Sequence, residues 1–325
     1  MMTDVTVTEF RQTAEAIEHQ IGKMIVGQRD VIRTVLTAII AGGHTLLEGV
    51  PGLGKTMLIR TISEVLDMEF SRIQFTPDLM PADITGTDVM DDVDGHRQFR
   101  FQKGPIFANL ILADEVNRAT PKTQSAMLEA MQEKTVTVSN ETYQLPRPFF
   151  VLATQNPLEM EGTYPLPEAQ LDRFLFKVDV QFPSADELSE ILNRTTGEEN
   201  PEPQIAADGA KIIAMQNLAR TVPVPTNVTH YVSRLIVGTH PSNSPSDLVK
   251  RYVRYGASPR GAQAIMLGAR ITALLAGRYN VSFEDVAAVA TPALRHRMIL
   301  NFEAQAGNIS ADQIIEDLVK SIPRE

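Results

Sequence analysis

Eight residues, Gly49 to Thr56, have the types and spacing of a loop that binds phosphate. They read Gly49-Val50-Pro51-Gly52-Leu53-Gly54-Lys55-Thr56 and satisfy G-x-x-x-x-G-K-[ST] in full. Glycines let the backbone N–H groups face an anion, and the N-terminus of a following helix adds partial positive charge. In such a loop Lys55 reaches the β- and γ-phosphates, and the Thr56 hydroxyl holds magnesium. The sequence therefore predicts a site for a nucleoside triphosphate and Mg²⁺.

Two carboxylates end an apolar run further along the chain. Asp114 and Glu115 follow Leu110-Ile111-Leu112-Ala113, and open α/β sheets bind ligands at the carboxyl ends of their strands. Asp114 would bind magnesium through a water molecule, and Glu115 would orient or deprotonate the attacking water. A GTPase would read guanine with Asn-Lys-x-Asp, and the sequence has no Asn-Lys pair. ATP is therefore the expected nucleotide.

Asn156 follows another apolar run, residues 149–155, and precedes Pro157. Its side chain could hydrogen-bond the γ-phosphate or position the lytic water. Asn before Pro is also a common way to begin a turn, so both interpretations stay open on the residues alone.

Two arginines also have two interpretations each. Arg173 stands between a helix and an apolar strand, either as a surface residue paired with Asp172 or as an arginine finger that reaches a neighbouring subunit's ATP. Arg260 lies in the first turn of a helix that Ser258 and Pro259 open, where the helix dipole disfavours a cation. Either it is solvated there, or an anion such as a triphosphate clamped between two domains lies nearby.

The composition limits the class of protein. A chain of 325 residues with 43% apolar residues can fill two domains. The absence of cysteine excludes disulfides, thiolate catalysis and zinc–thiolate sites. No run approaches the roughly 18 apolar residues of a membrane span, and the start does not resemble a signal peptide, so we expect a cytoplasmic protein. A net charge of −10 disfavours a protein that coats nucleic acid.

The elements that must position these side chains form an α/β pattern. Apolar, strand-like runs occur at 44–48, 69–75, 109–114, 149–155 and 174–180, mostly separated by helical patterns and preceded by helices over 8–25 and up to about residue 41. This favours a P-loop fold with a parallel sheet flanked by helices on both faces. Hairpins are expected at 86–103, with a turn at Asp94-Gly95, and at 135–147.

The pattern changes near Pro183. Ser184 and Glu187 form a predicted capping box, and the remainder is helical over 184–195, 207–220, 227–238, 259–276, 283–299 and 310–320. The sequence thus predicts a nucleotide-binding core over residues 1–183 and an all-helical C-terminal lid domain over residues 184–325.

Together these motifs resemble the AAA+ ATPases, and specifically the MoxR family, over nearly the whole chain. The segments that carry the resemblance are Leu47 to Thr56, Gln74-Phe75-Thr76-Pro77-Asp78-Leu79-Met80-Pro81, Asp114-Glu115-Val116-Asn117-Arg118-Ala119, Ala153-Thr154-Gln155-Asn156-Pro157 and Ala257-Ser258-Pro259-Arg260. The combination is narrower than any one of them.

The resemblance implies roles residue by residue. Lys55 and Thr56 correspond to Walker A, Asp114 and Glu115 to Walker B, Asn156 to the first sensor, Arg173 to the arginine finger and Arg260 to the second sensor on the lid. Ile25, Val26 and Gly27 match the segment that lines the adenine pocket, and Gln74 a residue that can couple Glu115 to bound substrate. The two hairpins match inserts that project toward the pore of related rings.

The family further implies an ATP-hydrolysing ring, usually of six subunits, that remodels or matures other proteins. Its members typically act with a partner that has a von Willebrand factor A domain, and often help to insert a metal or a cofactor. A nucleic-acid motor, with Arg97, Arg100 and Lys103 on the first hairpin, a magnesium-chelatase-like subunit and a nucleotide-gated scaffold are the alternatives. The acidic balance disfavours the first alternative.

Overall fold

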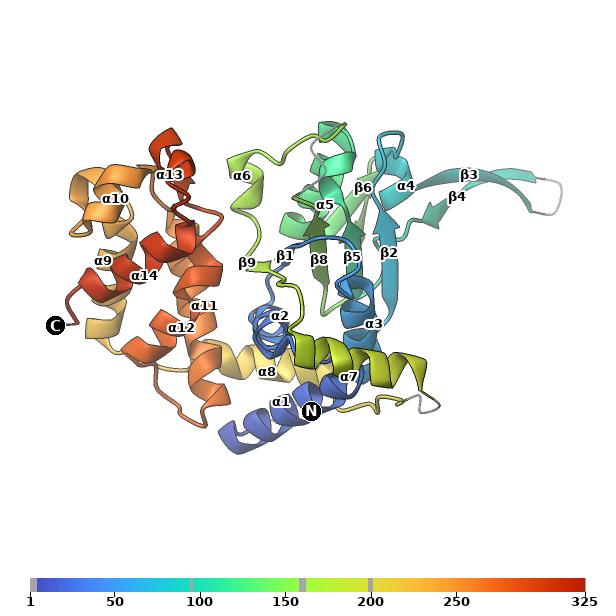
Figure 1. Cartoon of the computed structure of the whole chain (residues 1–325). Coiled ribbons are helices and arrows are strands. Elements are labelled where there is room, and N and C mark those ends of the chain that lie inside the picture. Colours follow the sequence, from blue (N-terminus) through green and yellow to red (C-terminus); the bar gives the residue numbers. More distant parts are fainter. Residues whose placement is uncertain (1–4, 94–95, 158–161, 198–200, 325) are drawn as a thin grey trace.

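The computed structural model describes residues 5–93, 96–157, 162–197 and 201–324. Its centre is a five-stranded sheet in the order β2-β5-β8-β1-β9, in which every pairing is parallel (Figure 1). The strands span Thr45–Glu48 (β1), Phe70–Gln74 (β2), Leu110–Asp114 (β5), Phe150–Gln155 (β8) and Phe176–Asp179 (β9). The five predicted strands and their parallel pairing are therefore confirmed.

Both faces of the sheet are buried, which explains why its strands are continuously apolar. Leu47, Leu112 and Leu152 lie in one hydrophobic cluster, whereas Leu46 and Ile111 lie in a second cluster on the other face. The first cluster contains residues of α1 (Val7–Met24), α2 (Arg29–Ala41) and α3 (Lys55–Val65). The second contains residues of α4 (Pro81–Thr85) and α5 (Pro121–Glu133). Helices thus cover both faces, as predicted.

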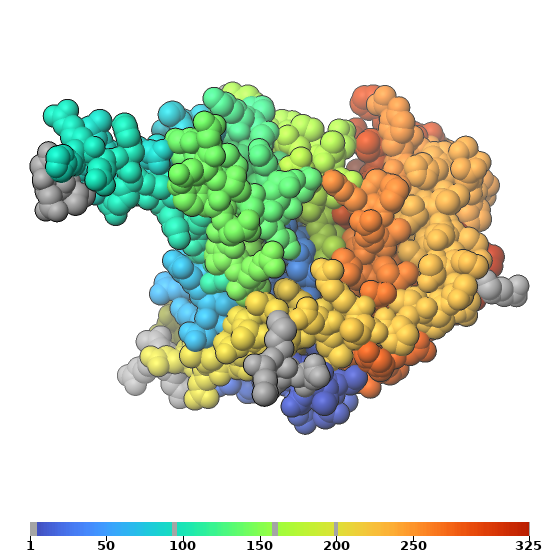
Figure 2. Space-filling view, turned by 180° about the vertical axis from the view of Figure 1, so that it is seen from behind, coloured from blue at the N-terminus to red at the C-terminus, as the bar shows by residue number. Residues whose placement is uncertain are grey.

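Two antiparallel hairpins extend this core. β3 (Gly86–Val93) pairs with β4 (His96–Lys103), and β6 (Thr135–Val138) pairs with β7 (Glu141–Gln144). The β3–β4 hairpin projects far from the body of the molecule, as Figure 2 shows from behind. Both hairpins are where the sequence predicts them, although the Asp94-Gly95 turn lies outside the described residues.

The two hairpins contact each other through aromatic rings. Phe101 of β4 stacks on Tyr143 of β7, with ring centroids 4.1 Å apart, and Phe107 packs edge-on against Phe101 at 5.7 Å. Aromatic packing therefore joins the two hairpins.

The C-terminal part is helical, as predicted, with one short sheet that the sequence does not reveal. Its helices are α7 (Ala185–Thr196), α8 (Gly209–Thr221), α9 (Thr226–Gly238), α10 (Asp247–Tyr252), α11 (Pro259–Leu275), α12 (Phe283–Leu294), α13 (Phe302–Ala306) and α14 (Ala311–Ser321). The added sheet pairs β10 (Val253–Tyr255) with β11 (Ile299–Leu300). Capping boxes start α7, α12 and α14 at Ser184, Ser282 and Ser310. α12 ends before the predicted residue 299, because the chain then turns to pack against the core.

The helices after residue 183 pack against the helices that cover the sheet. Arg194 of α7 donates hydrogen bonds to the carbonyl oxygens of Gly22 (3.0 Å) and Lys23 (2.8 Å) in α1. Residues of α8, α9, α11, α12 and α14 share one hydrophobic cluster with α1 to α3. The domain boundary near residue 183 stays a prediction. Among the described residues, no helix is long and apolar enough to cross a membrane.

Candidate functional site

The phosphate-binding sequence forms the loop between β1 and α3. Gly52 and Gly54 have φ angles of +86° and +75°, and nothing lies within 4 Å of a Cβ added to either residue. The need for glycine at these two positions is therefore conformational rather than steric. Gly54 caps α3, so Lys55 and Thr56 are the first two residues of that helix. Their backbone N–H groups thus lie at its positive end.

The Lys55 side chain is hydrogen-bonded to the phosphate loop. Its Nζ donates a 2.6 Å hydrogen bond to the carbonyl oxygen of Gly49. Burial lowers the pKa of Lys55 from its ordinary value, and the carboxylates of Asp114 and Glu115 oppose part of that change. The phosphate loop and the two carboxylates therefore share one electrostatic environment.

Asp114 ends β5, and Glu115 follows in an unusual backbone conformation. Glu115 has a φ angle of +57°, a region that a non-glycine residue occupies at a cost of about 1–3 kcal/mol. Thr154 of the neighbouring strand β8 supports it, because its Oγ1 accepts from the Glu115 N–H at 2.9 Å and donates to Asp114 Oδ1 at 2.6 Å. Thr154 thus fixes both acidic residues at the edge of the sheet.

Each of the two carboxylates also has an arginine partner. Arg72 Nη2 lies 2.7 Å from Asp114 Oδ2, and Arg118 Nη1 lies 2.9 Å from Glu115 Oε2. Gln74 Nε2 donates to the same Glu115 oxygen at 2.9 Å. The contact of Gln74 with Glu115 fits the resemblance. Arg72 and Thr154 are contacts that the sequence reasoning missed.

Asn156 lies directly after β8, at the same edge of the sheet. β8 lies between β5, which ends in Asp114, and β1, which leads into the phosphate loop. Asn156 therefore lies between these two motifs. Its side chain is buried, with 5% of the residue exposed. The structure therefore brings the three sequence motifs to one place.

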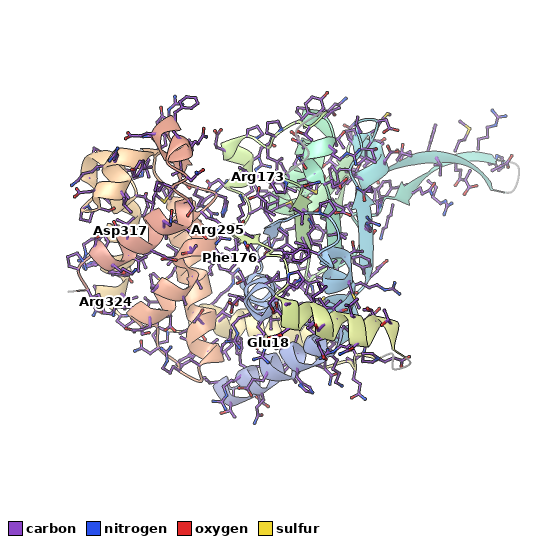
Figure 3. The ribbon with its side chains drawn as sticks, viewed as in Figure 1. Glu18, Arg173, Phe176, Arg295, Asp317 and Arg324 are labelled. Atoms are coloured by element: carbon purple, nitrogen blue, oxygen red, sulfur yellow. The ribbon has the colours of Figure 1, made fainter. Side chains whose placement is uncertain are left out.

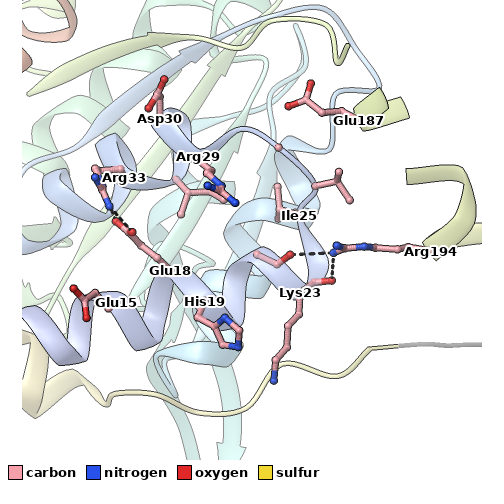
Figure 4. A pocket seen from close by; sticks show the side chains of 14 residues that line it. Glu15, Glu18, His19, Lys23, Ile25, Arg29, Asp30, Arg33, Glu187 and Arg194 are labelled. Carbon is pink, nitrogen blue, oxygen red and sulfur yellow. Dashed lines mark hydrogen bonds and ion pairs between the residues drawn. The ribbon is translucent and has the colours of Figure 1, made fainter. Parts of the chain in front are cut away.

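The segment expected to line the adenine pocket does line a large cavity. Ile25, Val26 and Gly27 form part of the wall of a pocket of about 900 Å³, to which α1, α2 and α7 contribute (Figure 4). Gln28 connects this wall to the phosphate loop, because its Nε2 donates to the carbonyl oxygen of Leu53 at 3.2 Å. The segment next to the cavity thus contacts the phosphate loop, although none of the residues that line the cavity belongs to that loop.

Arg173 and Arg260 lie at the opposite edge of the sheet. β9 runs parallel to β1, with Phe176 opposite Thr45, so Arg173 precedes β9 at the end where β1 begins. Figure 3 shows Arg173 beside α6 (Glu168–Leu171). Arg173 and Arg260 line one pocket of about 220 Å³. Its other walls include Gly43, His44, Met131 and Asp172.

This position changes the expectation for Arg260. Lys55 follows the carboxyl end of β1, whereas Arg260 shares a pocket with Gly43 and His44, which precede β1. The anion near Arg260 is Asp172, whose Oδ2 is 3.8 Å from Arg260 Nη1. Arg260 and the phosphate loop of the same chain thus lie at opposite ends of the strands.

The pair between Arg173 and Asp172, one of the two interpretations of Arg173, is absent from the described residues. Asp172 instead pairs with Arg297, whose Nε donates to Asp172 Oδ1 at 2.8 Å. Arg297 Nη2 also donates to the carbonyl oxygens of Asp172 (3.1 Å) and Phe174 (2.7 Å). Only 3% of the Arg297 side chain is exposed, so this buried arginine fixes the backbone on both sides of Arg173.

The residues present fit a magnesium ion that is bound together with a nucleotide. Among the described residues, no cluster of three or more His, Cys, Asp or Glu side chains could hold a metal alone. Mg²⁺ at nucleotide sites needs only one or two protein oxygens, because waters and phosphates supply the others. The Thr56 hydroxyl and the Asp114 carboxylate are oxygen donors of this kind.

Comparisons with known proteins agree with this geometry. The ATPase family associated with various cellular activities (AAA) matches residues 44–176, and the AAA lid domain matches residues 246–318. Chaperone MoxR1 of Mycobacterium tuberculosis is 42% identical over 95% of this chain and 82% of its own length. The uncharacterized protein YeaC of Bacillus subtilis is 43% identical over 95% of this chain and 93% of its own length.

A crystal structure of a candidate ATPase from Cytophaga hutchinsonii has a TM-score of 0.91 and 41% sequence identity to this chain. It covers 98% of this chain, and this chain covers 96% of it. The similarity thus extends through the sheet and the C-terminal helices. The chain belongs to the MoxR family of AAA+ ATPases.

Proposed function

We propose that this chain is one subunit of a cytoplasmic, ring-shaped machine, a homo-oligomer of six copies, that hydrolyses ATP to remodel or mature other proteins. The observation that carries the proposal is the position of the candidate residues at two opposite edges of one sheet. The phosphate loop, Asp114, Glu115 and Asn156 would bind ATP at one edge. Arg173 and Arg260, at the other edge, would complete the pocket of the next copy.

Each side chain has a defined task in this proposal. Lys55 and the N–H groups at the start of α3 hold the β- and γ-phosphates. Glu115, which Gln74 and Arg118 contact in the structure, would accept a proton from the attacking water, which Asn156 positions. Magnesium, held by Thr56 and Asp114, would supply positive charge that neutralises the phosphates. Arg173 and Arg260 of the next copy would stabilise the charge that develops on the transferred phosphoryl group.

The β3–β4 hairpin supports a protein as the client. Met90 and Phe99 are cross-strand partners, and they are 58% and 74% exposed. The described hairpin residues include three aspartates as well as Arg97, Arg100 and Lys103. Arg100 pairs with Asp91 at 3.0 Å, and Lys103 lies over the Phe107 ring at 5.4 Å. An apolar pair with balanced charges suits a polypeptide better than a nucleic acid.

The family resemblance extends the proposal to partners. A protein with a von Willebrand factor A domain would bring the client to the ring, and insertion of a metal or a cofactor into that client is one form of maturation. A magnesium-chelatase-like subunit would differ in needing a porphyrin-binding partner. A co-purification of the tagged chain that yields no von Willebrand factor A protein would count against this partner.

Replacement of Glu115 tests the chemistry. Loss of a positioned general base costs about 10²–10⁴-fold in rate, so Glu115→Gln should lower ATP turnover at least a hundredfold while nucleotide binding stays unchanged. Glu133→Gln, at an exposed position at the end of α5, is the matched control and should turn over normally. Unchanged turnover in Glu115→Gln would show that the water is activated elsewhere.

A further inference from the structure

Arg72 contacts one of the two acidic residues of the proposed ATP site, Asp114, and also contacts Gln74. It belongs to β2, which lies beside β5 (Figure 1), and Gln74, two residues later, is the register partner of Asp114. One nitrogen of Arg72, Nη2, donates 2.7 Å hydrogen bonds to both Asp114 Oδ2 and Gln74 Oε1. Arg72 therefore contacts the carboxylate expected to serve magnesium and the amide that holds Glu115.

The amide of Gln74 connects Arg72 to Glu115. Its oxygen accepts from Arg72, and its nitrogen donates to Glu115 Oε2 at 2.9 Å. Because both atoms belong to one planar group, the bond to Arg72 fixes the direction in which the nitrogen points. A displacement of Arg72 would release the Gln74 amide and with it one of the bonds on Glu115.

Both oxygens of Asp114 are engaged by protein donors. Oδ1 accepts from Thr154 and Oδ2 accepts from Arg72. A water bound to magnesium must donate to one of these oxygens, and the positive guanidinium beside Oδ2 opposes the approach of a second cation. The side chain of Arg72 is 48% exposed, so its departure into solvent has a small cost.

We propose that Arg72 competes with magnesium for Asp114, and that its displacement when the magnesium nucleotide binds releases Glu115 through Gln74. Arg72 is thus a positioning residue that makes the orientation of Glu115 depend on the occupancy of the cation site. The inference rests on the proposed function, because it requires a magnesium nucleotide in this pocket. A merely structural ion pair between Arg72 and Asp114 would give no such dependence.

Nucleotide affinity with and without magnesium tests the competition. The probe is a fluorescent N-methylanthraniloyl-ADP, titrated into the full chain in EDTA and in MgCl₂. The ratio of the two affinities should be larger in Arg72→Gln than in the wild type, by about fivefold, since an exposed charge pair no longer has to be broken. Arg72→Lys keeps the charge and should behave like the wild type in this ratio.

Arg60→Gln is the control for the loss of one positive charge. Arg60 lies on α3, is 71% exposed and pairs with Glu64 rather than with the site. An Arg72→Gln ratio equal to that of the wild type or of Arg60→Gln would overturn the proposed competition. If wild-type protein bound no nucleotide in either buffer, the proposed function would fail, and the inference with it.

A double-mutant cycle tests the connection to Glu115. Arg72→Gln and Gln74→Leu should each change ATP turnover without a client by a similar factor, and the double variant should add nothing to the single ones. Gln74→Leu should leave the magnesium ratio near the wild-type value, because Arg72 still contacts Asp114. Additive effects on turnover would show that Arg72 does not act through Gln74.

Discussion

The parallel strands of the central sheet end at one side, here called the carboxyl edge, and begin at the other, the amino edge. Arginine side chains are used in opposite ways at these two edges. At the carboxyl edge, Arg72 and Arg118 hold Asp114 and Glu115, and their side chains are 48% and 42% exposed. At the amino edge, Arg297 holds Asp172 and only 3% of its side chain is exposed. Exposed ion pairs contribute about 0–1 kcal/mol, whereas breaking a buried pair costs about 3–5 kcal/mol.

This difference indicates which edge can rearrange. The contacts of Arg72 with Asp114 and of Arg118 with Glu115 can exchange partners when a ligand arrives, since little free energy holds these exposed ion pairs. The segment that contains Arg173 is fixed by the buried side chain of Arg297, in the turn that follows α12. The molecule thus combines exchangeable arginine contacts at one end of the strands with a fixed backbone around Arg173 at the other.

The largest expected effect comes from inactivating Arg173 in some subunits and the phosphate loop in others. A ring made only of Arg173→Ala subunits should lose about 10³-fold or more in ATP turnover, and a ring of Lys55→Ala subunits should also be inactive. Mixing the two should restore about a quarter of the pockets, those that combine an intact loop with an intact neighbouring arginine. No recovery in rings shown to be mixed would place Arg173 outside the chemistry.

The same mixing distinguishes the two possible positions of Arg260. If Arg260 serves the next copy, Arg260→Ala and Lys55→Ala subunits should recover turnover together. If Arg260 served the pocket of its own subunit, no subunit in that mixture would have both Arg260 and Lys55, and turnover would not recover. Arg260→Ala mixed with Arg173→Ala is the control, because no copy would then present both arginines.

The second effect concerns the rigidity of the amino edge. Arg297→Met leaves Asp172 without its buried partner and should lower the free energy of unfolding by about 3 kcal/mol. Arg324→Met is the matched control, because Arg324 pairs with Glu284 at a surface site with 55% and 69% exposure, and it should change stability by less than about 1 kcal/mol. Urea unfolding of both variants measures the difference. Equal losses would mean that the amino edge is no more rigid than the surface.

The smallest effect is a dependence of stability on pH at the same edge. His44 Nδ1 accepts from the Val151 N–H at 3.0 Å, and its other ring nitrogen contacts the Met131 carbonyl oxygen at 3.1 Å. The ring is therefore neutral, and burial lowers its pKa from 6.5 to about 4. The unfolded chain binds this proton near pH 6.5, so stability falls as the pH drops from there toward 4, by about 2 kcal/mol between pH 7.5 and pH 5.

Urea midpoints at about pH 7.5 and about pH 5 measure this dependence. His44→Asn keeps an acceptor for Val151 but cannot titrate, so its midpoint should change less between the two pH values. The remaining change includes His296, whose pKa burial lowers well below 6.5. A pH dependence identical to that of the wild type would show that His44 is not the titrating group.

Much of this site could be predicted from sequence, because its parts are local. The phosphate loop is contiguous, and Asp114, Glu115 and Asn156 each follow an apolar strand. Capping boxes such as Ser184 with Glu187 lie within four residues. Parallel pairing then brings the strand ends together without any further information.

The remaining contacts join residues that are distant in sequence. Arg72 and Asp114 are 42 positions apart, and Arg297 and Asp172 are 125 positions apart. Nothing in the residue types distinguishes these arginines from ordinary surface charges. The edge on which Arg260 lies depends on how the C-terminal helices pack against α2 and β9, which local patterns do not encode. The two strands of the short sheet have only three and two residues, too few for a periodicity.

The opposite positions of Lys55 and Arg173 also restrict how copies can associate. A pair related by a two-fold axis would present identical patches to each other, so neither copy could offer the beginning of its strands to the end of the other's. If Arg173 completes the pocket of the next copy, as proposed above, association would run head to tail, with the same direction at every contact. An open row would leave one terminal pocket idle, and only closure on itself gives every copy a working neighbour.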